Sequence, residues 1–227
     1  MSLETGGISA IRPRRMREDA RRNRERLLAA ARDAFVEQGA HAPLDDIARR
    51  AGVGIATLYR HFPDRAALLR QLALDLLVRS AHEASTALSE EPDAFGALAR
   101  YLRRALDLRI AAVMPVVVGQ LRLDEELLAA RSASAEAVDQ IITAAHADGS
   151  LRPDAASGDV GLLLVRLSRP LPGPFPAAVN HRLAQRHLEL LLDGLRPPAL
   201  PGVPLPGPAM TFEDLAAMPP PDRGRTR

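Results

Sequence analysis

Four side chains able to contact nucleic acid lie close together between positions 57 and 61. Thr57, Tyr59, Arg60 and His61 supply two hydroxyl groups and two groups that can carry positive charge. Hydroxyls and cations of this kind bind phosphate oxygens and the edges of bases in a DNA groove. We therefore expect this segment to contact double-stranded DNA.

The surrounding pattern predicts a helix-turn-helix over residues 43–62, with short helices at 44–51 and 55–61. Gly52 lies in the turn, where glycine adopts a positive φ without steric cost. The second helix is expected to enter the major groove with the four polar side chains on or near its outer face. Both short helices are expected to pack against a preceding helix over 19–38 through Ile47, Ala48, Val53, Leu58 and Phe62.

The rest of the chain also predicts helices, because apolar residues recur with helical spacing and no strand-length segment alternates with period two. Asp64 is suited to cap a helix, and Pro115 is suited to begin a short one. We predict an all-α protein: a helix-turn-helix domain over 20–80, a larger helical bundle over 81–196, and a tail over 197–227. The tail holds nine of the 19 prolines, which predicts disorder or polyproline apart from a helical turn at 212–218.

The first part of the chain is basic. Between positions 10 and 70 there are 14 Arg and 8 acidic residues, a net charge of +6, whereas the whole chain carries +2. This asymmetry indicates that only the first part meets a polyanion. Residues 1–16 lack periodicity and are predicted to form an irregular arm, whose cations include Arg14 and Arg15. The arm either contacts the minor groove or phosphates of DNA, or is a solvated leader.

The helix-turn-helix carries several motifs at ungapped spacing: Asp46-Ile47-Ala48, Ala51-Gly52-Val53, Thr57-Leu58-Tyr59, His61-Phe62 and Leu68. With the apolar first helix, they make residues 22–72 resemble the TetR family of transcriptional regulators. The resemblance implies a homodimer whose two recognition helices enter successive major grooves of a palindromic operator.

The resemblance also implies roles for individual side chains. Thr57 and Tyr59 stand where the family contacts phosphates or bases, and His61 stands at a frequent backbone contact. Arg65 takes the place of a phosphate-binding residue that is commonly Lys, whereas Pro43-Leu44 replaces a Ser or Thr that often caps the helix. The full set predicted to bind DNA is Leu44, Ile55, Ala56, Thr57, Tyr59, Arg60, His61, Arg65, Arg14 and Arg15.

A second patch comprises Leu151-Arg152-Pro153-Asp154, Gly158-Asp159-Val160, residues 162–167, Arg169-Pro170 and His187-Leu188. It resembles the C-terminal domain of the SbtR-like subgroup, which implies a helical bundle that encloses a pocket for a small-molecule effector. The alternative for any single residue of such a pocket is ordinary core. The predicted pocket residues are Leu102, Leu106, Ile110, Met114, Val117, Val118, Leu121 and Ile142.

Two segments carry more apolar surface than one bundle can bury. Residues 160–167 are apolar on nearly every side, and the final helix, over 177–195, has two apolar faces. Pairing two such helices from each chain would bury the surplus in a symmetric contact. The predicted dimer interface consists of Leu163, Leu167, Leu183, His187, Leu190 and Leu191.

Other classes of function lack comparable motifs. The chain has no Cys, no HExxH pair, no Gly-rich phosphate loop and no GxSxG motif, so we expect no catalysis, cofactor or metal. With no membrane-length apolar run and no secretory signal, we expect a cytoplasmic protein. The prediction is a ligand-responsive repressor. The alternatives are an architectural DNA-binding protein without a ligand or, with least support, a helical enzyme.

Overall fold

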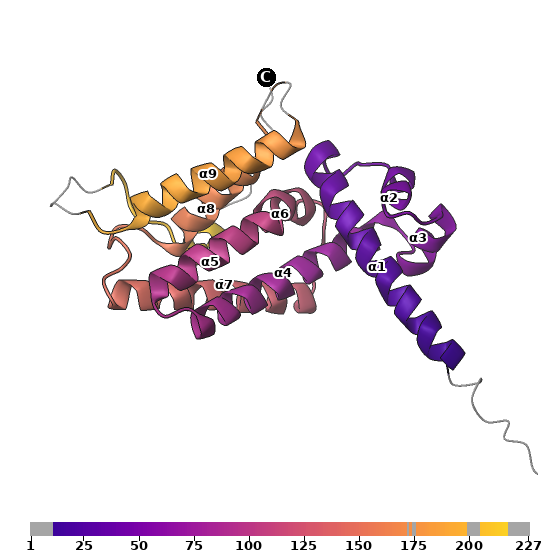
Figure 1. Cartoon of the computed structure of the whole chain (residues 1–227), viewed down its shortest axis with the longest axis horizontal. Coiled ribbons are helices and arrows are strands. Elements are labelled where there is room, and N and C mark those ends of the chain that lie inside the picture. Colours follow the sequence, from indigo (N-terminus) through magenta and orange to yellow (C-terminus); the bar gives the residue numbers. More distant parts are fainter. Residues whose placement is uncertain (1–10, 172, 174–175, 199–204, 218–227) are drawn as a thin grey trace, which may run out of the picture. The chain divides into compact units, whose positions relative to one another are not determined.

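The computed structural model describes residues 11–171, 173, 176–198 and 205–217, and these ranges contain helices and no strand, which confirms the all-α prediction. Figure 1 shows the arrangement along the chain. The helices are α1 (Ile11–Gln38), α2 (Leu44–Arg50), α3 (Ile55–His61), α4 (Arg65–Glu90), α5 (Ala94–Asp107), α6 (Ile110–Val118), α7 (Glu125–Ala147), α8 (Ser157–Ser168), α9 (Ala177–Leu195) and α10 (Phe212–Ala217). Among the described residues, none of the helices is long and apolar enough to cross a membrane.

The chain divides into two compact units. The described residues up to Leu74, together with Pro115–Arg122, form the first unit, and the remaining described residues form the second. The division falls inside α4 and again inside α6, so these two helices contribute to both units. The boundary expected at 80/81 also lies within α4.

In the first unit α2 packs against α1, and α3 packs against α2. Leu27, Phe35, Ile47 and Leu58 are fully buried, as the apolar spacing predicts. Gly52 adopts a φ of 66° between α2 and α3, which a residue with a Cβ rarely adopts. The turn therefore takes the tight form expected from the sequence.

The prediction of an irregular arm over residues 1–16 is wrong for residues 11–16, because these residues belong to α1. Pro13 lies in the first turn of the helix, where the missing backbone N–H would have no intrahelical partner. Further along, ion pairs between residues four apart, such as Arg21 with Glu25 at 2.9 Å, stabilise the exposed helix. Residues 1–10 lie outside the described residues.

The short apolar helix predicted to begin at Pro115 begins instead at Ile110, so Pro115 lies inside α6. The break comes earlier because Leu108 ends α5 and Arg109 adopts a φ of 54° in the left-handed region. Pro115 consequently removes the hydrogen bond that its N–H would give to the carbonyl four residues earlier.

The second unit is a bundle in which α5 packs against α7 and α9, and α8 lies beside α9 (Figure 1). Asp93 caps α5 by accepting a hydrogen bond from Gly96 N at 2.7 Å, and Asp124 caps α7 through Leu127 N at 2.9 Å. On the surface, Arg103 of α5 makes two hydrogen bonds to the Glu189 carboxylate of α9, at 2.8 and 2.7 Å. Capping and ion pairing thus add to an apolar core.

The described part of the C-terminal tail, residues 205–217, lies on the bundle, whereas disorder or polyproline was predicted for the tail outside the turn at 212–218. Residues 205–217 lie against the region of α8, and α10 supplies the short helical turn predicted at 212–218. The backbone N–H groups of Leu205 and Met210 are bound by the carboxylates of Asp154 and Asp159. Residues 199–204 and 218–227 lie outside the described residues.

Candidate DNA-binding site

The short helix α3 turns its polar side chains away from the core. Leu58 is fully buried and Phe62, immediately after the helix, is 2% exposed, so these two residues fix the rotation of α3. Tyr59 is 49% exposed, and Arg60 is exposed beside it. The helix therefore presents a phenol and a guanidinium group on a solvent-facing surface.

Thr57 and Arg60 interact with each other on that surface. Arg60 Nη2 donates a hydrogen bond of 2.9 Å to Thr57 Oγ1. Because the threonine hydroxyl acts as an acceptor here, its own proton remains available to a further acceptor such as a phosphate oxygen. The pair thus presents an O–H donor next to a positive charge.

His61 is half-buried at the end of α3, and its environment opposes protonation. Burial lowers the pKa of His61 below its ordinary value of 6.5, and the nearby positive charges of Arg24 and Arg60 lower it further. The Arg24 guanidinium carbon lies 5.7 Å from the centre of the neighbouring Phe62 ring. Arg24 of α1 therefore contributes to the site, although it was not among the residues predicted to bind DNA.

Arg65 holds the loop between α1 and α2. Its Nη1 atom donates hydrogen bonds to the carbonyl oxygens of Ala40, at 2.9 Å, and Ala42, at 2.7 Å. The residue predicted to bind phosphate thus also positions the backbone that leads into α2.

The remaining residues of the predicted set differ in exposure. Leu44 and Ile55 are half-buried at the starts of α2 and α3, whereas Ala56 is exposed. Arg14 and Arg15 belong to α1, but their side chains lie outside the described part of the structure. Their contact with DNA stays a prediction.

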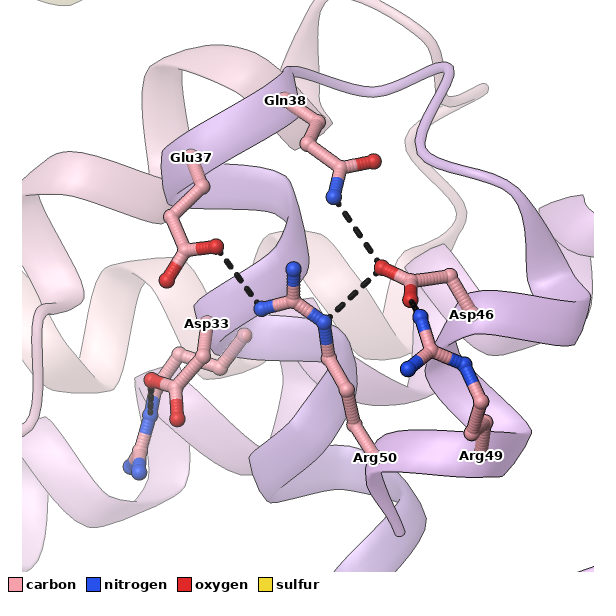
Figure 2. Close-up of polar contacts among 7 residues, drawn as sticks. Asp33, Glu37, Gln38, Asp46, Arg49 and Arg50 are labelled. Carbon is pink, nitrogen blue, oxygen red and sulfur yellow. Dashed lines mark hydrogen bonds and ion pairs between the residues drawn. The ribbon is translucent and has the colours of Figure 1, made fainter.

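A polar cluster that the sequence analysis missed joins α2 to the end of α1 (Figure 2). Arg50 Nη1 donates to Glu37 Oε2 at 2.7 Å, and Arg50 Nε donates to Asp46 Oδ2 at 2.8 Å. Asp46 also accepts from Gln38 Nε2 at 3.0 Å and from Arg49. The spacing of Asp46 and Arg50 by four residues was a visible signal for part of this cluster.

The cluster fixes the charge of its members. The hydrogen bond from Gln38, followed by the Arg50 guanidinium, lowers the pKa of Asp46, and the hydrogen bond to Glu37 raises the pKa of Arg50. Both groups therefore stay ionised over the neutral range. Since Arg50 contacts both helices, it positions α2 on α1, and through the turn at Gly52 it positions α3.

Comparisons with known proteins agree with this geometry. A family model described as bacterial regulatory proteins of the tetR family matches residues 27–72, and the C-terminal domain of SbtR-like transcriptional regulators matches residues 91–197. The crystal structure of a TetR transcriptional regulator from Streptomyces coelicolor is 34% identical, covers 78% of this chain and 99% of its own, and has a TM-score of 0.55. The chain belongs to the TetR family.

Two further TetR-type relatives resemble the chain to different extents. A TetR regulatory protein from Mycobacterium vanbaalenii is 32% identical, covers 80% of this chain and 99% of its own, and has a TM-score of 0.54. An HTH-type transcriptional regulator of Staphylococcus aureus (strain USA300) is 43% identical over 54 residues. That match spans 23% of this chain and 29% of the length of the curated relative.

The residues predicted to line an effector pocket in this TetR-family chain differ in burial, and they are divided between the two units. Leu102, Leu106 and Ile142 of the second unit are buried, as is Val117, which is grouped with the first unit. Ile110 is 9% exposed. Met114 and Leu121 are half-buried, and the Val118 side chain lies outside the described part. Burial agrees equally with a pocket lining and with ordinary core, so the pocket stays a prediction.

The bundle also holds three buried hydroxyl groups that the sequence analysis missed. Ser134 Oγ donates to Ser80 Oγ at 2.8 Å, and Ser80 Oγ lies 2.9 Å from Tyr101 Oη. Burial raises the pKa of Tyr101, which keeps the phenol neutral. These groups join α4, α5 and α7 through an otherwise apolar region.

The predicted dimer residues lie where α8 and α9 are not covered by their own unit. On α9, Leu188 and Leu192 are buried, whereas Leu190 is 61% exposed and His187 is exposed. Four others are half-buried: Leu163, Leu167, Leu183 and Leu191. The two apolar faces of α9 thus separate into one that faces the bundle and one that still exposes apolar surface.

Proposed function

We propose that this TetR-family chain is a transcriptional repressor that binds a palindromic operator as a homodimer and leaves it when a small molecule binds. The observation that carries the proposal is the outward surface of α3, where Tyr59 and Arg60 are exposed and Thr57 is half-buried while Leu58 packs into the core. Two such helices, one from each chain, would read two half-sites about 34–36 Å apart.

Selecting bound fragments from random duplex DNA with the full-length protein tests whether the protein recognises a specific base sequence. We expect the bound fragments to share an inverted repeat, and we expect at least a thousandfold preference over unrelated DNA, which is within the usual range for specific complexes. Fragments without any common sequence, bound with equal affinity, would support an architectural protein instead.

The effector part of the proposal rests on the buried apolar residues of the second unit. An effector shifts the protein between two states only by its difference in affinity for them. We expect a screen of small apolar molecules to find one that raises the melting temperature and releases the selected operator. Chemical turnover of such a molecule would instead support an enzyme.

The environment of His61 predicts that operator binding strengthens as the pH falls. In the free protein its pKa lies below 6.5, and a DNA phosphate next to the ring would raise it, so binding takes up a proton. The operator affinity therefore rises as the pH falls from the pKa of His61 in the complex to the lower pKa of His61 in the free protein. The rise is up to about tenfold per pH unit. Anisotropy titrations from pH 7.5 to 5.5 measure it. The His61→Gln variant should lose this part of the dependence, and an equal slope in both proteins would remove His61 from the interface.

The basic N-terminal segment predicts a strong salt dependence. Replacing Arg12, Arg14, Arg15 and Arg17 by Gln keeps good helix-forming residues at the start of α1 but removes four charges. If the segment contacts phosphates, affinity should fall for every DNA sequence. The slope of log K against log salt should also flatten by about 0.9 for each lost contact. The same slope in wild type and variant would identify the segment as a solvated leader.

A further inference from the structure

The N-terminal half of α8 has a face without side chains, and the backbone of the C-terminal tail lies against it. A Cβ atom added to Gly158 would lie 2.5 Å from the Met210 carbonyl oxygen and 2.6 Å from that of Thr211. A Cβ added to Gly161 would lie 2.7 Å from Cε1 of the Phe212 ring. At Gly158 the neighbouring atoms are backbone, so a Cβ there would displace the tail, and at Gly161 a Cβ would force the Phe212 ring to move.

Hydrogen bonds hold residues 205–217, which we call the C-terminal strap, at this face. Asp159 N donates to the Met210 carbonyl at 3.2 Å, and Met210 N donates to Asp159 Oδ2 at 3.2 Å. The same carboxylate oxygen accepts from Ala156 N at 3.0 Å, at the beginning of α8. Phe212 N donates to Ser157 Oγ at 3.4 Å. The Asp159 carboxylate therefore binds both the strap, through Met210, and the beginning of α8, through Ala156.

The strap is also connected to the end of α9. Leu205 N donates to Asp154 Oδ2 at 2.9 Å, and Arg152 binds the same carboxylate. The hydrogen bond from Arg152, followed by that from Leu205, lowers the pKa of Asp154 to about 2. Arg152 in turn donates through its backbone N–H to Leu195 and through Nη1 to the Gly194 carbonyl. One continuous set of bonds thus runs from the strap to both α8 and α9.

The strap lies beyond the family domain that this chain shares with its relatives, because the matching C-terminal model ends at residue 197. It nevertheless docks on one of the two helices that carry exposed leucines. Leu162 of α8 is 39% exposed, and Leu190 of α9 is 61% exposed. Leu162 comes four residues after Gly158, so it lies on the same side of α8, at the edge of the docked strap. Leu162 and Leu190 are both exposed with the strap in place, so both can contact a second copy of the chain.

We propose that the strap is a positioning element of the dimer interface. By docking on Gly158 and Gly161, it holds α8 beside α9 so that the exposed leucines of both helices form one surface for a second copy of the chain. This inference rests on the homodimer of the proposed function. Because the strap covers Gly158 and Gly161, the partner packs beside the strap, on Leu162 and the exposed leucine of α9.

The Gly158→Ala variant of the full-length chain tests the inference. Its new Cβ has no room beside the strap backbone, so we expect hydrogen exchange at the Met210 and Phe212 amides to speed up at least tenfold. The dimer dissociation constant from sedimentation should rise at least tenfold as well. Gly54→Ala is the matched control, because a Cβ there meets nothing within 4 Å and Gly54 precedes α3, outside α8, α9 and the strap, so it should change neither quantity.

Phe212→Ala gives the same two readouts without altering α8, and it decides the question if Gly158→Ala fails to fold. Adding Gly161→Ala to Phe212→Ala should weaken the dimer less than the two single changes predict together, since the smaller side chain leaves room for the new Cβ. Such partial compensation is not expected from general destabilisation.

Each remaining outcome contradicts a definite part of the account. A wild-type chain that is monomeric would overturn the proposed homodimer and this inference with it. A wild-type dimer whose variants release the strap but dimerise equally well, or better, would overturn this inference alone. Unchanged exchange in both Gly158→Ala and Phe212→Ala would also overturn it, because docking would then not depend on the contacts described.

Discussion

Replacing Leu190 by Glu should convert the protein from a dimer into a monomer and lower operator affinity at least about 100-fold. Leu190 is 61% exposed within its own chain, so a charge there costs the folded monomer little. In a symmetric interface the change would bury two unpaired carboxylates, at several kcal/mol each, and about 1.4 kcal/mol already changes an equilibrium tenfold. Sedimentation at micromolar concentration and anisotropy with operator DNA measure the two effects.

Leu128→Glu is the control for this substitution. Leu128 lies on α7 and is 47% exposed, so it receives the same chemical change at a comparable exposure outside the proposed interface. We expect it to remain a dimer and to bind the operator normally. If Leu190→Glu and Leu191→Glu both remained dimeric, the interface would not include this face of α9.

Replacing Tyr59 by Ala should lower operator affinity by about 10- to 100-fold and leave helix content unchanged. The expected loss corresponds to roughly 1–3 kcal/mol, the usual contribution of a good side-chain contact in a DNA groove. Because Tyr59 is 49% exposed and Leu58 carries the packing of α3, the fold should tolerate the change. Titration with operator DNA and circular dichroism together measure the outcome.

Tyr59→Phe separates the ring from the hydroxyl group. If the hydroxyl binds a phosphate, the Phe variant should lose part of the affinity, and if the ring contacts bases, it should retain most of it. Wild-type affinity in both the Ala and the Phe variant, with folded protein, would place Tyr59 outside the interface.

The elements with strong local signals could be predicted from the sequence. The bounds of α3 at 55–61 and of α9 at 177–195 match the expectation, because Gly54 and Pro176 precede these helices and apolar spacing defines their faces. The orientation of α3 could be predicted from Leu58, because burial of this residue turns Tyr59 and Arg60 towards solvent. For these elements, periodicity and helix-ending residues were sufficient.

The features that depend on unusual backbone or on distant contacts could not be predicted. Arg109 adopts a left-handed φ that its residue type does not signal, so the start of α6 was misplaced. The apolar spacing predicts that α2 packs on α1, but it does not specify which surface side chains meet there, so the pairing of Arg50 with Glu37 could not be predicted. Disorder or polyproline was predicted for residues 205–211 because the whole tail over 197–227 holds nine of the 19 prolines, whereas in the structure these residues lie close to the glycines of α8.

The central claim is that two copies of α3 bind one operator in successive major grooves. It is tested most directly by titrating the full-length protein against the selected operator and against a version with five base pairs inserted between the half-sites. Five base pairs rotate one half-site by about half a turn, since one turn takes 10–10.5 base pairs. The account predicts two chains bound per native operator and at least a tenfold loss of affinity on insertion. Equal affinity for both duplexes, or one chain bound per duplex, would contradict it.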